Sequence, residues 1–289
     1  MICLYNRCIV ERLPELSMER ILEDSELLLQ TILDWGRNSQ NRLVFIERRD
    51  KYTLFRNPQN FLLTSIDTDG DTNLAASSKD VLLQEFFKKD QTSLPTTEGH
   101  LWLQEGRKKW VKHYFSLRAS GIYYTPKGKL KSGDMVCLAS LEHVKVYRCV
   151  AFKRKFSAPT DHVFSVKHPK VQTFKSKHVY CFCAETPRLK EMWIQMIRMG
   201  KYGYNMYEDY ITTQQQLEYL LLPTAKTDAM RTKKRSTDQS SGERVLGKKN
   251  VLGEIFSSAW SKGDARIQRS KNMGGQSSSN DSCSSDESL

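Results

Sequence analysis

The chain has 289 residues, a formal net charge of +12 and a pI near 9.3, which leaves room for about two domains. Its mean hydropathy of −0.57 indicates that part of the chain lacks the apolar content of a core. No apolar run approaches the about 18 residues of a membrane span, and Arg7 and Glu11 interrupt the stretch that a signal peptide would need.

The excess of positive charge favours an anionic partner, which could be a membrane surface, a nucleic acid or an acidic protein. Seven cysteines without the spacing of a disulfide framework indicate a reduced, cytosolic compartment.

Residues 1–63 are typical of a small α+β domain. Residues 1–10 are expected to form a strand, and residues 42–49 and 52–55 two more. Between them, residues 24–36 predict a helix that begins at Asp24 as N-cap and ends at Gly36, with Leu28, Ile32 and Trp35 on one face. One strand and one helix before the last two strands can enclose only a small hydrophobic core, so this domain is expected to be incomplete.

Residues 64–97 form a polar connection around one apolar segment, "VLLQEFF". Val81, Leu82, Glu85 and Phe86 fit a short helix, because polar linkers seldom expose two adjacent phenylalanines. We expect this helix to pack between the two domains and make them one rigid unit. A flexible tether is the alternative.

Residues 98–210 are dense in strand patterns and close with a helix. Short segments punctuated by Gly, Pro and Ser indicate a small barrel or sandwich. In the last segment Thr186 is the expected N-cap and Pro187 the first helical residue, with Trp193 central on the apolar face. The expected strands are 99–104, 110–118, 121–125, 135–140, 143–148, 162–167 and 178–185.

Residues 211–289 are expected to be a mostly disordered tail, because they are charged, polar and of low complexity. Within them, residues 251–260 ("VLGEIFSSAW") place six apolar side chains on one helical face, as a partner-binding helix does.

Three blocks carry a resemblance: "EGHLWLQEGRKKWVKHYFSLRASGIYYTPKGK", "SAPTDHVFSVKHPKVQ" and "MIRMGKYGYNMYEDY". They resemble the pleckstrin-homology (PH) domain of the MRL adaptors (MIG-10, RIAM and lamellipodin). Residues 11–63 look like the second half of the Ras-association (RA) domain of that family. The resemblance implies an α+β architecture: a partial, ubiquitin-like RA domain, then a seven-stranded PH barrel or sandwich capped by a C-terminal helix.

The same resemblance implies a cytoplasmic adaptor, recruited to the plasma membrane or the leading edge, that links a Ras-family GTPase and a phosphoinositide membrane to actin-regulatory proteins. The first strands of the family's RA domain face the GTPase. They have no counterpart in this sequence, so we expect GTPase binding to be weak or lost. The proline-rich segments of the family are also absent, since the eight prolines do not cluster.

A basic hairpin is the candidate site, because the cations of two neighbouring turns can converge on the phosphates of an inositol headgroup. In lipid-binding PH domains a basic residue usually follows the tryptophan of this hairpin, with an arginine two positions later. Val111 and His113 stand there instead, and His113 supplies charge only when protonated. The alternative is a solvated charge run. The candidate residues are Arg107, Lys108, Lys109, Lys112, His113, Lys127 and Lys129.

Other functions are less consistent with the sequence. No phosphate loop, catalytic triad order or paired-carboxylate pattern occurs, so no enzyme, catalytic residue or cofactor is expected. Cys181 and Cys183 lack a second ligand pair for a metal and are expected in the core. Aromatic residues interleaved with lysine could bind single-stranded nucleic acid. These aromatic side chains are expected instead in the hydrophobic core of the barrel, so no nucleic-acid partner is expected. A purely protein-binding scaffold remains the third interpretation.

Overall fold

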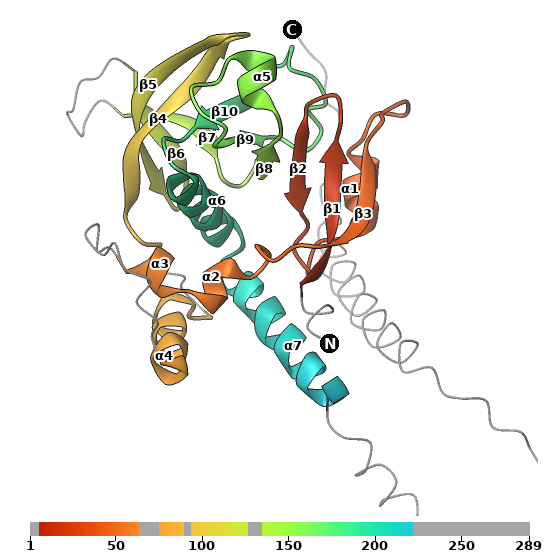
Figure 1. Cartoon of the computed structure of the whole chain (residues 1–289), viewed down its shortest axis with the longest axis vertical. Coiled ribbons are helices and arrows are strands. Elements are labelled where there is room, and N and C mark those ends of the chain that lie inside the picture. Colours follow the sequence, from red (N-terminus) through yellow and green to blue (C-terminus); the bar gives the residue numbers. More distant parts are fainter. Residues whose placement is uncertain (1–5, 64–74, 90–93, 127–134, 222–289) are drawn as a thin grey trace, which may run out of the picture. The chain divides into compact units, whose positions relative to one another are not determined.

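The computed structural model describes residues 6–63, 75–89, 94–126 and 135–221 (Figure 1). Two parts are distinguished here: the N-terminal domain, residues 6–63, and the strand-rich domain, residues 97–202. Of the tail expected over residues 211–289, residues 211–221 are helical. Residues 222–289, including residues 251–260, lie outside the described residues.

The N-terminal domain is built on three antiparallel strands. β1 (Arg7–Leu13) pairs with both β2 (Met18–Ile21) and β3 (Arg42–Glu47). Ser17 adopts the left-handed φ of 52° in the turn that joins β1 to β2. The sequence predicted β3 but placed the first strand too early and missed β2, because the short "MERI" segment alternates buried and half-buried positions only over four residues.

The helix α1 (Leu28–Leu33) is shorter than expected, and its N-cap is Leu27 rather than Asp24. Asp24 does not cap it, because its carboxylate accepts hydrogen bonds from Lys51 Nζ (2.6 Å) and the Tyr52 hydroxyl. The expected apolar face is largely exposed: Leu28 keeps 41% of its surface and Ile32 keeps 47%. At the end of this face, Trp35 Nε1 donates a hydrogen bond to Glu11 Oε1 (2.7 Å).

Residues 52–55 do not form the expected strand. They belong to α2 (Thr53–Arg56), which is followed by α3 (Gln59–Leu62). The helical turn places the rings of Tyr52 and Phe55 against Tyr210, with centroids 5.3 and 4.7 Å away. Burial of these rings decides the local conformation over the strand propensity of the sequence.

The connection contains the expected helix, α4 (Ala76–Phe86). Leu82, Leu83 and Phe87 are buried in the main core, where Phe87 contacts the rings of Phe55 and Tyr207 at 5.3 and 5.5 Å. Val81 stays 65% exposed. This part of the connection is therefore packed.

All seven expected strands of the strand-rich domain are present. They are β4 (Thr97–Gly106), β5 (Lys109–Arg118), β6 (Gly121–Thr125), β7 (Val136–Ser140), β8 (Lys145–Cys149), β9 (Val163–Lys167) and β10 (Val179–Cys183). Between β8 and β9 lies the short helix α5 (Phe152–Phe156).

The helix α6 (Pro187–Tyr202) closes this domain, as expected. The Thr186 side chain accepts a hydrogen bond from Leu189 N (3.1 Å) and caps it. Trp193 is 1% exposed and meets the ring of Phe115 edge-on at 6.5 Å. The sequence predicted one helix here, but a second, α7 (Tyr204–Leu221), follows after Gly203, whose φ of 50° interrupts the helix.

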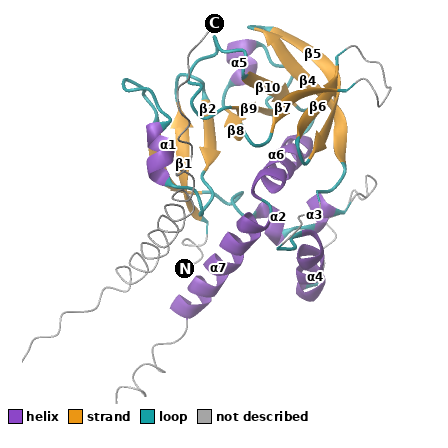
Figure 2. Ribbon diagram, turned by 180° about the vertical axis from the view of Figure 1, so that it is seen from behind, coloured by secondary structure: helices purple, strands orange, loops and turns teal. Residues whose placement is uncertain are grey.

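The two domains share one sheet, as Figures 1 and 2 show from opposite sides. Its strand order is β3-β1-β2-β8-β9-β10-β4-β5-β6-β7, and the joint is the β2–β8 pair, Met18 opposite Cys149 and Glu19 opposite Arg148. Buried ion pairs reinforce the joint, among them Arg198 of α6 with Glu23 at 2.7 Å. The sheet and these pairs make the N-terminal domain part of the same folded body.

Candidate functional site

The turn between β4 and β5 carries three of the predicted cations. A bulge between Gln104 and Gly106 shifts the register here, and Gln104 Nε2 donates to the Arg107 carbonyl oxygen (3.1 Å). Arg107, Lys108 and Lys109 are all exposed. The turn therefore holds its backbone in place and presents its cations to solvent.

Lys112 and His113 lie on opposite faces of β5, as the alternation of a strand requires. The Lys112 ammonium lies over the ring of Trp102, 4.9 Å from its centroid, on the outer face. His113 points inward, is 6% exposed and meets the ring of Tyr124 edge-on at 5.4 Å. The two residues cannot hold the same phosphate group.

The inward-facing His113 is paired with a carboxylate. A hydrogen bond of 3.0 Å joins His113 Nε2 and Glu105 Oε1, and Lys109 Nζ lies 3.0 Å from Glu105 Oε2. The hydrogen bond from Lys109, followed by the one from His113, holds the pKa of Glu105 below its ordinary value. The Glu105 carboxylate thus offsets part of the positive charge at this turn.

A groove of about 730 Å³ opens beside the turn. One side is the β4–β5 turn, and the other is the loop that joins β9 to β10 (residues 168–178). Arg107 lines this groove, as do Lys175 and Lys177 of the opposite loop, and the hydroxyl-bearing Thr173 and Ser176 of that loop line it too. Phosphate groups are bound by this combination of cations and hydroxyl donors.

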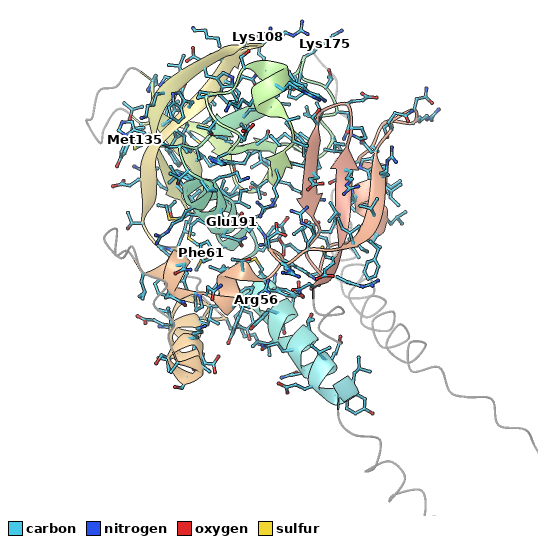
Figure 3. The ribbon with its side chains drawn as sticks, viewed as in Figure 1. Arg56, Phe61, Lys108, Met135, Lys175 and Glu191 are labelled. Atoms are coloured by element: carbon cyan, nitrogen blue, oxygen red, sulfur yellow. The ribbon has the colours of Figure 1, made fainter. Side chains whose placement is uncertain are left out.

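The helix α5 adds a third basic segment, Lys153, Arg154 and Lys155, all exposed. The segment is fixed beside the other two because Trp110 Nε1 donates to the Phe156 carbonyl oxygen (2.9 Å). The ring of Phe156 also lies 5.1 Å from that of Phe174 in the β9–β10 loop. Lys108 and Lys175 lie at the same end of the molecule, near α5 (Figure 3).

We call this surface the basic end. Its exposed cations come from three separate segments: Arg107, Lys108 and Lys109; Lys153, Arg154 and Lys155; and Lys170, Lys175 and Lys177. The sequence analysis named only the first three, although the run "FKRKF" and the lysines of "HPKVQTFKSKH" between two strands were visible signals. Lys127 and Lys129 lie outside the described residues.

The cysteine pair that could suggest a metal is in the core. Cys181 and Cys183 are at most 1% exposed, and burial raises the pKa of Cys183 above its ordinary value. Among the described residues, no group of three His, Cys, Asp or Glu side chains could hold a metal ion. Nor does any helix in this part of the chain have the length and apolar character needed to cross a membrane.

A family model, "PH domain", matches residues 95–202. Human "Ras-associated and pleckstrin homology domains-containing protein 1" is 37% identical over 283 residues, which cover 91% of this chain and 22% of that protein. The chicken (Gallus gallus) "Amyloid beta A4 precursor protein-binding family B member 1-interacting protein" is 41% identical over 210 residues, 72% of this chain and 43% of that protein. This chain thus spans less than half the length of these curated relatives.

Two further comparisons agree with these. "Abnormal cell migration protein 10" of Caenorhabditis elegans is 34% identical over 213 residues, 71% of this chain and 27% of that protein. The crystal structure of the coiled-coil, RA and PH domains of lamellipodin is 42% identical with a TM-score of 0.67, and the match covers 74% of this chain and 78% of that one. The strand-rich domain is therefore a PH domain, and the chain belongs to the MRL family of adaptors, with an RA-type N-terminal domain joined to it.

Proposed function

We propose that this chain binds phosphoinositide-containing membranes through the basic end of its PH domain. The observation that carries the proposal is the convergence of three basic segments, separate in the sequence, at one end of the PH domain, where Arg107, Lys175 and Lys177 line one open groove. These cations are all exposed, so burial in the core does not explain why they gather there. Binding of an anionic ligand would explain why the cations cluster at this end.

The chemistry of the groove suits a phosphorylated inositol ring. The lysines supply point charges, Arg107 supplies a planar fork of donors, and the hydroxyls of Thr173 and Ser176 can donate to further phosphate oxygens. Around the groove the remaining cations face an anionic leaflet, where each contributes about 1 kcal/mol. Lys112 lies over Trp102 on the outer face, and we assign it to the surrounding contact with the leaflet rather than to the groove.

As a member of the MRL adaptors, the chain has no proposed catalytic role. We propose that membrane recruitment from the cytoplasm places it where Ras-family GTPase signals and actin-regulatory proteins meet, at the plasma membrane or the leading edge. The names of its relatives refer to Ras association and to cell migration, and both properties come to this chain as part of the proposal.

The test is co-sedimentation with vesicles that contain a phosphoinositide, compared with vesicles matched in total charge by phosphatidylserine. Lys108→Glu and Lys175→Glu each reverse one charge, so each should weaken binding roughly thirtyfold, from about 2 kcal/mol. Lys88→Glu is the matched control, because Lys88 is exposed and follows α4, which lies at the end of the domain away from α5 (Figures 1 and 2).

Equal binding of all three variants would contradict the proposal. Equal binding of the wild-type chain to both kinds of vesicle would show that the chain binds anionic surfaces in general and does not recognise phosphoinositides. A single-stranded oligonucleotide added as competitor tests the nucleic-acid alternative. We expect the oligonucleotide to compete only through its negative charge and not by base stacking. Two tryptophans of this end already have partners, since Lys112 lies over the Trp102 ring and Trp110 donates to the Phe156 carbonyl oxygen.

A further inference from the structure

The groove is not made by the PH domain alone. Glu15 and Leu16, from the turn between β1 and β2, form part of its wall. The same turn is held against the PH domain, since Val150 N donates to the Ser17 carbonyl oxygen (2.9 Å) and Lys155 Nζ donates to Ser17 Oγ (2.5 Å). The N-terminal domain therefore reaches the edge of the candidate lipid site.

A second contact ties the N-terminal domain to the loop that carries Lys175 and Lys177. Asn41 Nδ2, in the segment between α1 and β3, donates to Gln172 Oε1 (2.7 Å). Gln172 Nε2 in turn donates to the Pro169 carbonyl oxygen (2.7 Å) and to the Asp34 carbonyl oxygen (3.4 Å). One amide side chain thus bridges the segment 34–41 of the N-terminal domain and the β9–β10 loop.

The start of the same loop is fixed by a buried lysine. Lys167, at the end of β9, is 0% exposed, and its ammonium lies 4.4 Å from the centre of the Tyr147 ring. It donates to the carbonyl oxygens of His168 (3.5 Å) and Pro169 (3.2 Å). The Pro169 carbonyl oxygen therefore accepts from both Lys167 and Gln172, and these bonds set where the loop leaves the sheet.

We propose that Gln172 is a positioning residue, through which the N-terminal domain holds the β9–β10 loop so that Lys175 and Lys177 face Arg107 across the groove. The lipid site is then a joint site of both domains. This inference rests on the proposed function for its effect on lipid binding, but the restraint of the loop is a separate property.

The physical reason is preorganisation. A loop whose lysines are already in position loses little conformational entropy when it binds an anion. A loop released from these contacts loses more conformational entropy on binding, and this loss weakens its affinity. Each bond of Gln172 is an ordinary hydrogen bond, so its loss should weaken binding by roughly two- to tenfold. The cations themselves remain, so binding is weakened and not abolished.

The experiment compares the full chain with Gln172→Ala, Asn41→Ala and the double variant. We expect each single variant to bind phosphoinositide vesicles roughly two- to tenfold more weakly, and the double variant to bind no more weakly than Gln172→Ala, because both changes break one shared contact. Gln214→Ala is the matched control, since its amide donates to the Tyr210 hydroxyl (2.8 Å) on α7.

Hydrogen exchange without lipid provides the second measurement. Residues 170–178 should exchange faster in Gln172→Ala and Asn41→Ala than in the wild type and in Gln214→Ala. Unchanged exchange and unchanged affinity would overturn the inference, as would fully additive effects of the two changes. If the wild-type chain does not bind the vesicles, the proposed function fails, and exchange alone decides whether Gln172 holds the loop.

Discussion

Arg198 of α6 is the polar centre of the contact between the two domains, and its loss should have a large effect. Its guanidinium donates to both carboxylate oxygens of Glu23 (2.7 and 2.9 Å), and Nη1 donates to the Lys51 carbonyl oxygen (3.3 Å) and to Gln195 Oε1 (2.7 Å). The side chains of Arg198 and Glu23 are only 8% and 7% exposed. Desolvation lowers the pKa of Arg198, but the charge and the hydrogen bonds of Glu23, together with the charge of Glu191, raise it above its ordinary value.

Arg198→Ala would leave the Glu23 carboxylate buried without its partner. Breaking a buried pair in this way costs about 3–5 kcal/mol, a large share of the about 5–15 kcal/mol that stabilises a folded domain. The N-terminal domain should open first, because a segment of its size buries too little surface to stay folded without the contact.

Urea unfolding monitored by circular dichroism measures the cost, and hydrogen exchange of β1–β3 locates it. The matched control is Glu23→Leu with Arg198→Met, which removes both charges and should cost less than Arg198→Ala alone, since apolar replacements of a buried pair are often neutral. A loss below about 1 kcal/mol for Arg198→Ala, or additive losses in the cycle of variants, would refute the reasoning.

Of three further predictions, the first and the last follow from burial in the fold, and the second follows from the family resemblance. Burial lowers the pKa of Lys167 to about 8 from 10.5, so the unfolded chain binds the proton more tightly and this group's contribution to stability rises with pH between about 8 and 10.5. Between pH 7 and 9.5 the free energy of unfolding of the wild type should therefore gain about 2 kcal/mol relative to Lys167→Met in urea titrations; a constant difference would show that the ammonium is not desolvated. Calorimetry with GTP-loaded Ras-family proteins should give weak or no binding to this chain, and a GTP-dependent dissociation constant of about 1 μM or tighter would contradict that prediction. Amides of residues 82–86 in α4 and of Phe87 after it should exchange slowly, because Leu82, Leu83 and Phe87 are buried; uniformly fast exchange there would mean that the connection is not packed in solution.

The PH domain could be predicted from the sequence because its signals are local. Each strand alternates and is bounded by turn residues, and β6 occupies the predicted Gly121–Thr125. Thr186 and Pro187 mark the start of α6 unambiguously. In these elements the local propensity and the burial in the tertiary structure favour the same conformation, so the secondary structure can be predicted from the sequence alone.

The N-terminal domain was harder to predict because its conformation depends on distant partners. Tyr52 and Phe55 have strand propensity, but they pack on Tyr210, which lies more than 150 residues later in the chain. Asp24 has the composition of an N-cap, yet Lys51 and Tyr52 occupy its carboxylate. Neither contact leaves a trace in the local sequence.

The candidate site was predicted in part for a similar reason. A turn between adjacent strands, such as Arg107 to Lys109, can be read from one stretch of sequence. The lysines of the β9–β10 loop reach the same groove only because β10 pairs with β4 in the sheet, with Phe182 opposite Leu103. The pairing of His113 with Glu105 also depends on how β4 and β5 align, because this alignment brings Glu105 Oε1 within 3.0 Å of His113 Nε2.

The shared sheet and the buried ion pair between the domains have a consequence for the proposed membrane binding. Because β2 pairs with β8 and Arg198 holds Glu23, the orientation of the N-terminal domain relative to the basic end is set before any partner arrives. A membrane bound at the basic end then presents β3, the first strand in the order of the shared sheet, at a fixed distance and angle. With a flexible tether, each partner would instead bind at an effective concentration that falls with linker length. In this chain the paired strands replace such a tether, so the effective concentration does not depend on linker length. Breaking the β2–β8 pairing should therefore reduce any coupling between the membrane and a partner of the N-terminal domain, even where each binding surface is intact.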